Sequence, residues 1–229
     1  ISEVELLIFL LDGSGSMTET KTPDGREKVE YLIEILNGEG GLIERLRKSE
    51  SASRYRVHTI YFSEKIEEEK GYIELKDVII KNAVEVAGGG QTAIAKAIDK
   101  ATEILDEFSN DQMLPKEKWA SAFLFTDGQE NMGGNVQESA NKFKTHLLSP
   151  ILAIVGIGEE ADEDLLLEIA NYSTDKQRRH LDEANVLKYL PDRDKLYLRG
   201  HEEGILTRDK AEILRQFVYV LSTTKIEKL

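Results

Sequence analysis

The first residues that could do chemistry follow an apolar run near the start of the chain. The run over 6–11 ends in a carboxylate and two hydroxyls separated by glycines, namely Asp12, Ser14 and Ser16. An unbroken apolar strand is typical of a parallel sheet covered on both faces. Carboxylate and hydroxyl oxygens are hard donors, which Mg²⁺ and Mn²⁺ prefer. The stretch therefore predicts a metal site at the carboxyl end of a strand, where open α/β sheets bind ligands.

The same residue types are also common in ordinary turns and helix caps. Two other clusters in the sequence help to decide between a turn and a metal site. Three glycines at 88–90 precede Thr92 at the mouth of a predicted helix, and glycine lets the backbone pass close to a ligand. A second apolar run, over 120–126, ends at Asp127. If the chain reverses direction between the two strands, they are neighbours at the topological switch point. Five oxygen donors from three loops would then face one point.

Elements that position these residues alternate along the chain. Apolar runs predict strands at 6–11, 55–62, 120–126 and 150–158, with a weaker edge strand or hairpin at 73–75 and 78–80 after an acidic turn at 67–69. Helical spacing predicts helices at 29–36, 42–48, 94–108, 135–148, 162–170 (with Asp162 as N-cap) and 208–221 (capped by Thr207). One short strand is expected at either 178–181 or 195–198.

Strands that alternate with helices imply right-handed crossovers and a parallel sheet. We therefore predict an α/β fold with a doubly wound, mostly parallel sheet and helices on both faces. The 229 residues suffice for one domain of this kind, so 1–229 is expected to be a single domain. The charged segment 173–206 carries little periodic signal and is the atypical part of that domain.

Composition narrows the classes of partner. The net charge of −13 argues against nucleic acid and anionic membranes, and no stretch has the 18 apolar residues of a membrane span. The chain has no cysteine, which excludes a disulfide-linked oligomer and favours a reducing, cytoplasmic location. An extracellular location stays open, because a leader could have been removed.

The three clusters together resemble the von Willebrand factor A domain. Its Asp-x-Ser-x-Ser signature matches Asp12, Ser14 and Ser16, and its later Thr and Asp match Thr92 and Asp127. The resemblance covers about 4–170 plus the last helix, whereas 173–206 departs from the usual compact ending. The form of the motif and the lack of cysteine look more like intracellular bacterial or archaeal members than secreted animal ones.

The resemblance implies a metal-ion-dependent adhesion site, holding Mg²⁺ or Mn²⁺ through these five residues. In this family the serines and the threonine tend to touch the ion, and the carboxylates often act through water. Neutral hydroxyls leave the ion electron-poor, with an exchangeable position that an Asp or Glu of a partner protein fills. The resemblance thus implies a protein-binding module with no catalytic residues and no organic cofactor.

An enzyme of phosphoryl transfer or phosphate-ester hydrolysis is the alternative, because Mg²⁺ beside Asp and Thr also serves that chemistry. Against it, the segment 88–92 lacks the Gly-Lys-Ser/Thr ending of a P-loop, and no second Asp adjoins Asp12. The four histidines show no ligand spacing, so zinc is not expected. Glu130 and Asn131 either border the site or cap the loop that follows. Aromatic residues in the strand patterns are expected in the core, namely Tyr61, Phe62, Trp119, Phe123 and Phe125.

Overall fold

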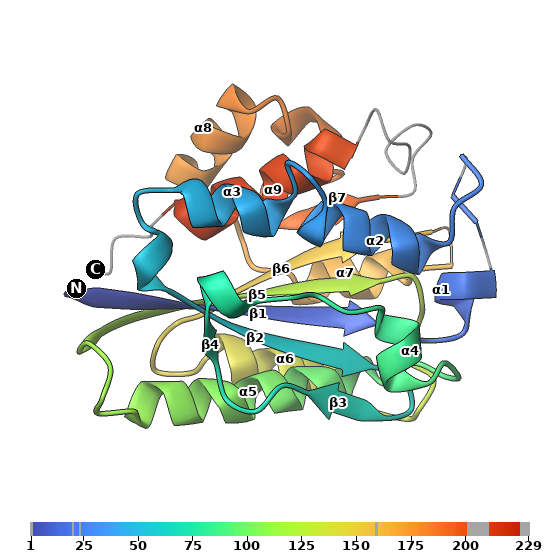
Figure 1. Ribbon diagram of the computed structural model, residues 1–229. Helices are drawn as coiled ribbons and strands as arrows, with labels where there is room; N and C mark the ends of the chain where they lie inside the picture. Colours follow the sequence, from blue (N-terminus) through green and yellow to red (C-terminus); the bar gives the residue numbers. More distant parts are fainter. Residues whose placement is uncertain (1, 20, 23, 159, 201–210, 225–229) are drawn as a thin grey trace.

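A computed structural model describes residues 2–19, 21–22, 24–158, 160–200 and 211–224. Within these residues the strands form one sheet in the order β3-β2-β1-β5-β6-β7, and β4 also pairs with β2 (Figure 1). The strands are β1 (Glu3–Asp12), β2 (Tyr55–Phe62), β3 (Ile66–Glu68), β4 (Ile73–Glu74), β5 (Glu117–Thr126), β6 (Ile151–Gly156) and β7 (Tyr197–Arg199). Among the described residues, no helix combines the length and apolar character needed to span a membrane.

The centre of the sheet is β1, which pairs in parallel with β2 on one side and β5 on the other. Strand order therefore reverses at β1, as the site prediction required. Asp12 lies opposite Phe62 of β2, and the neighbouring Leu11 lies opposite Phe125 of β5. The carboxyl ends of the three strands thus lie side by side. The predicted α/β class with a mostly parallel sheet is confirmed, since among the strands of the described residues only β3 and β4 run antiparallel.

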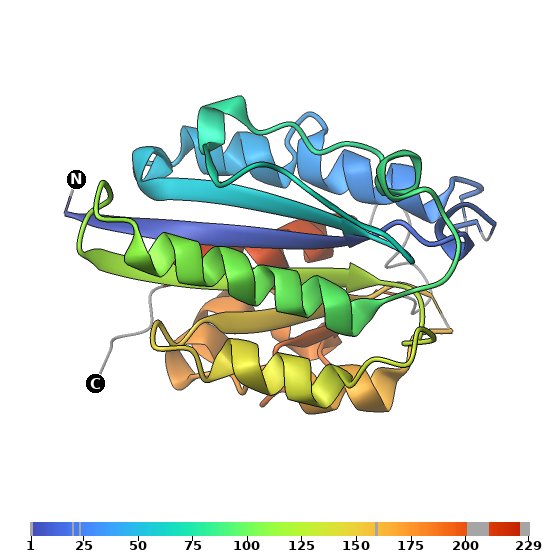
Figure 2. The same cartoon turned by 90° about the horizontal axis from the view of Figure 1, so that it is seen from below.

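Helices cover both faces of the sheet (Figures 1 and 2). One face carries α2, α3, α4, α8 and α9, and the opposite face carries α5, α6 and α7. The helices are α1 (Ser16–Glu19), α2 (Lys28–Asn37), α3 (Leu42–Lys48), α4 (Ala83–Ala87), α5 (Ile94–Asn110), α6 (Val136–Lys144), α7 (Glu163–Ile169), α8 (Asp175–Glu183) and α9 (Ala211–Thr223). Short 3₁₀ helices span Ala52–Arg54, Leu75–Asp77 and Leu187–Tyr189.

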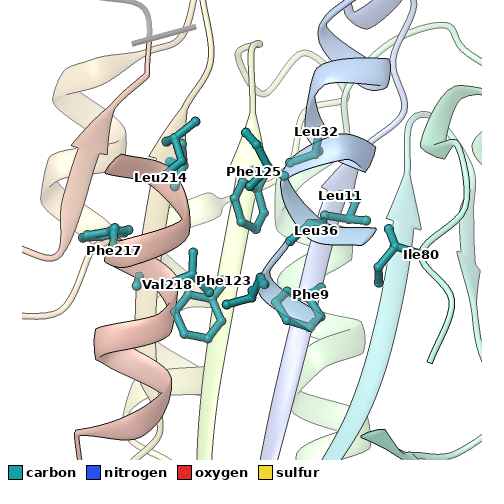
Figure 3. Close-up of a cluster of buried hydrophobic side chains, with 14 of the residues drawn as sticks. Phe9, Leu11, Leu32, Leu36, Ile80, Phe123, Phe125, Leu214, Phe217 and Val218 are labelled. Atoms are coloured by element: carbon teal, nitrogen blue, oxygen red, sulfur yellow. The ribbon is translucent and has the colours of Figure 1, made fainter. Parts of the chain in front are cut away.

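The two-residue period of β1 divides its apolar side chains between two cores. Phe9 and its same-face neighbours join the core under α2 and α9, and Ile8 and its neighbours join the core under α5. The rings of Phe9 and Phe123 stack with centroids 5.9 Å apart. Figure 3 shows Leu36 of α2 and Phe217 of α9 among the side chains gathered around this pair. Buried aromatic side chains contribute strongly to core energetics, so this pair stabilises the packing of β1 beside β5.

The edge of the sheet differs from the sequence prediction. The acidic residues at 67–69 are not a turn, because Glu67 and Glu68 belong to β3 and pair with Tyr61 and Ile60. The strand expected at 73–75 is reduced to the two residues of β4, and 78–80 lies outside the strands. Charged side chains are common on edge strands because they discourage pairing with another chain. An acidic edge strand therefore has no apolar pattern to reveal it.

The carboxyl-terminal part also differs in detail. Segment 178–181 is helical rather than a strand, because Thr174 and Gln177 form a capping box that starts α8. The short strand is β7, close to the alternative at 195–198. Of the expected final helix, 211–223 is observed as α9, whereas Thr207 lies outside the described residues. Predicted helix 135–148 ends earlier, at Lys144, and α4 had no counterpart in the prediction.

The predicted aromatic core is confirmed with one exception. Tyr61, Phe62, Phe123 and Phe125 are buried, whereas Trp119 is only half-buried. Its neighbour Lys118 is the buried residue at the start of β5, where its ammonium donates to the carbonyl oxygens of residues 109 and 111. The N-cap prediction for Asp162 also holds, because its carboxylate accepts from the backbone N–H of Leu165 at 3.2 Å.

Candidate metal site

The candidate site lies where β1 and β5 end, at the edge of the sheet beside α1. The carboxylate of Asp12 accepts a hydrogen bond from the backbone N–H of Ser14 at 2.8 Å, which folds the loop back on the strand end. The hydroxyls of Ser14 and Ser16 are 3.1 Å apart, and Ser16 donates to Oδ1 of Asp127 at 2.7 Å. A continuous chain of oxygen atoms therefore joins the first loop to the end of β5.

The second carboxylate oxygen of Asp12 faces β5. Oδ2 accepts from the hydroxyl of Thr126 at 2.7 Å and lies 3.4 Å from the backbone nitrogen of Asp127. Both aspartates are fully buried. Burial, and secondly the charge of Asp127, raise the pKa of Asp12 to about 6, against the lowering effect of the bonds from Ser14 and Thr126. A cation near this cluster would favour the charged form of the Asp12 carboxyl.

Thr92 comes from the third loop, which packs against the other two. The backbone N–H of Gly15 donates to the carbonyl of Gly90 at 3.0 Å, which joins the glycine-rich loop to the first loop. The Thr92 hydroxyl is 3.0 Å from the position that a Cβ on Gly128 would take. Glycine at 128 therefore leaves room for this hydroxyl directly after Asp127. Thr92 is itself buried, whereas Ser16 is half-buried and opens the cluster to solvent.

Glu130 and Asn131 hold the Thr92 loop in place. The amide oxygen of Asn131 accepts from the backbone N–H of Thr92 at 2.7 Å. The carboxylate of Glu130 accepts from the N–H of Ile94 at 2.6 Å and from that of Gly134 at 2.9 Å. Ile94 is the first residue of α5, whose N-cap Ala93 has no side chain able to cap it. Glu130 therefore supplies the missing cap of α5, and its bond to Gly134 fits the expectation that it caps the loop that follows.

Lys28, at the start of α2, provides the positive charge within this cluster. Its ammonium donates to Oδ2 of Asp127 at 3.0 Å, on the carboxylate oxygen that Ser16 leaves free. It also lies 3.6 Å from the carboxylate of Glu160, on the loop after β6. The lysine side chain is 4% exposed and that of Glu160 is 59% exposed. The cluster thus holds two buried carboxylates and one buried ammonium.

All the residues that the sequence singled out as metal ligands lie at this one edge. Two residues of this cluster were missed in the sequence analysis, Thr126 and Lys28. Thr126 had a signal, since a hydroxyl residue ends an apolar strand directly before Asp127. Lys28 had none, because a lysine at the polar start of an amphipathic helix is expected to face solvent. Lys96, expected to be solvated, is exposed.

The donor set fits a hard divalent cation. Three hydroxyls and two carboxylates supply only oxygen, the donor type of Mg²⁺ and Mn²⁺ sites. The two carboxylates together carry two negative charges and the Lys28 ammonium one positive charge, which leaves one negative charge that a cation could balance. Across the described residues there is no cluster of three His, Cys, Asp or Glu suited to a metal. Any ion here would therefore depend on the hydroxyls as well as the aspartates.

The fold and the cluster define a doubly wound α/β domain with a hydroxyl–carboxylate site at its switch point. The chain belongs to the von Willebrand factor type A domain family, whose model matches residues 7–193. A comparison with curated protein sequences finds no match. The helix α9 lies beyond the matched range but packs on the same core as α2.

Solved structures support the same fold. Proximal thread matrix protein 1 from the mussel byssus is 17% identical, with a TM-score of 0.60 over 95% of this chain. This chain spans 48% of that protein, about half its length. Manganese-loaded TRAP protein of Plasmodium vivax is 20% identical, with a TM-score of 0.53 over 92% of this chain and 74% of that one.

Proposed function

We propose that this chain is a divalent-cation-dependent protein-binding module. In this proposal Mg²⁺ or Mn²⁺ is held by Asp12, Ser14, Ser16, Thr92 and Asp127, and the ion accepts an Asp or Glu side chain of a partner protein. The observation that carries the proposal is the linked set of hydroxyls and buried carboxylates from three loops at one sheet edge. Membership of a family that typically mediates metal-dependent protein interactions supports it, as does the manganese in the TRAP structure.

The chemistry of the donors favours binding over catalysis. Neutral hydroxyls neutralise less of the ion's positive charge than carboxylates do, so the bound ion would remain a strong acceptor for an anion. The half-buried Ser16 leaves one side of the cluster open to solvent, where a partner's carboxylate would enter. A net charge of −13 opposes an acidic partner at long range. Salt screens that effect beyond about 8 Å, whereas a direct bond between carboxylate oxygen and metal acts at about 2 Å.

The first test uses Mn²⁺ as both ligand and reporter. Bound Mn²⁺ with an exchangeable water enhances the relaxation of bulk water protons, and a carboxylate that replaces this water lowers the enhancement. We expect wild-type protein to show the enhancement and acetate to reduce it in a saturable way, with acetamide as the uncharged control. Enhancement that acetate leaves unchanged would contradict carboxylate capture by the ion.

The second test concerns a protein partner. Binding should require Mg²⁺ or Mn²⁺, disappear in excess chelator and fail in Thr92→Ala with the fold retained. One Asp or Glu of the partner should be indispensable, and its Asn or Gln substitution should remove most of the affinity. A partner that binds equally well in chelator would make the metal merely structural. Metal-dependent hydrolysis of a generic phosphate ester, lost in Asp12→Ala, would instead favour an enzyme.

A further inference from the structure

A buried lysine within a cluster built for a cation is unexpected. Lys28 is the first residue of α2, where the positive end of the helix dipole disfavours a cation. Its side chain is also almost completely removed from solvent, which disfavours the charged ammonium further. The position is therefore unfavourable for lysine unless nearby carboxylates compensate. Asp127 does so directly, at 3.0 Å.

The surroundings accommodate this ammonium specifically. A Cβ built on Gly158 would lie 2.6 Å from the Lys28 nitrogen, so the absence of a side chain at 158 leaves space for the ammonium. The backbone of Gly158 has a φ of 94°, which also favours glycine. The ammonium thus lies between the loop after β5 and the loop after β6. It contacts Oδ2 of Asp127, one of the proposed ligands, whereas Ser16 contacts Oδ1.

We infer that Lys28 is a tethered competitor of the divalent cation, an inference that rests on the proposed metal site. In the metal-free protein its ammonium neutralises Asp127 and keeps the loop ends together. A divalent ion that binds Asp127 must displace the ammonium or tolerate its repulsion at short range. Either way, Lys28 lowers the affinity of the site and raises the metal concentration at which the protein becomes loaded.

Glu160 offers the displaced ammonium a second partner. Its carboxylate lies 3.6 Å from the Lys28 nitrogen and its side chain is largely exposed. A small shift of the lysine side chain would exchange the pairing with Asp127 for pairing with Glu160. The ammonium would then avoid isolation in the interior, which is the costly state for a buried charge. Metal loading would thereby reach the loop between β6 and α7.

The experiment compares Mn²⁺ affinity in wild type, Lys28→Met, Lys28→Gln and Lys118→Met by calorimetry. Lys28→Met removes the charge at similar length, and Lys28→Gln keeps a donor for Asp127 if the apolar variant folds poorly. Lys118→Met is the matched control. Lys118 is also buried, but it lies at the start of β5 and donates to the backbone carbonyls of residues 109 and 111. At about 3.3 Å per residue it is roughly 30 Å from Asp127.

We expect both Lys28 variants to bind Mn²⁺ at least about tenfold more tightly than wild type, because the repulsion between like charges is gone. Lys118→Met should bind as wild type does. In the absence of metal, Lys28→Met should unfold at a lower temperature, and saturating Mn²⁺ should raise its melting temperature more than that of wild type.

Other results would distinguish a failure of competition by Lys28 from a failure of the proposed metal site. If Lys28→Met and Lys28→Gln bind Mn²⁺ no more tightly than wild type, Lys28 only braces Asp127 and the competition is refuted. If Lys118→Met gains as much affinity, the effect is one of net charge and the inference is again overturned. If no variant binds Mn²⁺ at all, the metal site itself is wrong. Binding by the Lys28 variants but not by wild type would support competition in its strongest form.

Discussion

Replacing Glu130 tests whether the loop that carries Thr92 is held as the structure indicates. Glu130→Ala removes the acceptor for two backbone N–H groups, those of Ile94 and Gly134. It also removes the negative charge beside the amino end of α5, where Ala93 provides no cap. Glu130→Gln is the milder change, since it retains one acceptor oxygen but no charge.

The size of the effect follows from these contacts. A hydrogen bond to a charged group contributes about 1.5–3 kcal/mol to the free energy of unfolding when it is shielded from water. Glu130 is half-buried, so water replaces part of each bond when the side chain is removed. The favourable interaction with the helix dipole adds about 0.5 kcal/mol. We therefore expect Glu130→Ala to lower the free energy of unfolding by about 2 kcal/mol, and Glu130→Gln by about half as much.

Urea unfolding of the metal-free protein measures this loss, and Mn²⁺ calorimetry measures its effect on the site. Glu130→Ala should also weaken Mn²⁺ binding, because the loop that carries Thr92 loses one of its supports, although the bond from the Thr92 N–H to Asn131 remains. The control is Thr174→Ala, which removes the N-cap of α8 and should cost about 1 kcal/mol without changing Mn²⁺ affinity. A Glu130→Ala protein within about 0.5 kcal/mol of wild type would refute the capping argument.

Three further predictions concern pH, packing and the core. Burial and the charge of Asp127 raise the pKa of Asp12 to about 6, so a proton competes with the metal below that pH. Mn²⁺ affinity measured by calorimetry should therefore be about tenfold weaker at pH 5 than at pH 7. Equal affinity at the two pH values would contradict the raised pKa. Gly13→Ala places a Cβ 2.2 Å from the carbonyl oxygen of Ala83, so urea unfolding should show a loss of about 2 kcal/mol or more. Phe123→Ala should cost about 3–5 kcal/mol in the same assay, whereas Met113→Ala, at a 92% exposed position, should cost less than about 0.5 kcal/mol.

The sequence was most informative where burial imposes a continuous pattern. The apolar run ending at Asp12 predicted a strand covered on both faces, and β1 is the central strand. The spacing over 94–108 predicted α5 closely, because one face of that helix packs on the sheet. Signals of this kind are strong, since a single misplaced charge in a core is costly.

Elements at the periphery gave weaker signals for physical reasons. β3 carries glutamates because its side chains are exposed or half-buried, so it resembled an acidic turn. α8 has a charged sequence with Gln177 and Leu181 as its only buried described residues. Its start carries a signal that the sequence prediction did not use, because Thr174 followed three residues later by Gln177 forms a capping box. An edge strand and a half-solvated helix need little apolar surface, and their patterns are correspondingly faint.

The candidate site likewise contains residues that the sequence predicts and one that it does not. Its proposed ligands could be read from the sequence because each follows a strand or opens a helix at a glycine-marked turn. Lys28 could not, because its contact with Asp127 joins residues 99 positions apart and depends on how α2 lies across the sheet. Contacts of this kind follow from the tertiary arrangement. The electrostatic state of the site therefore emerges only from the structure.

Calorimetric titration of metal-free protein with Mn²⁺ tests the central claim most directly. We predict one ion bound per wild-type chain, and no binding by Asp12→Ala with circular dichroism and urea unfolding showing the fold retained. The fold should survive because Asp12 lies at the strand end, beyond the apolar residues that form the core. Asp12→Ala protein that binds Mn²⁺ with wild-type affinity would contradict the assignment of this cluster as the metal site.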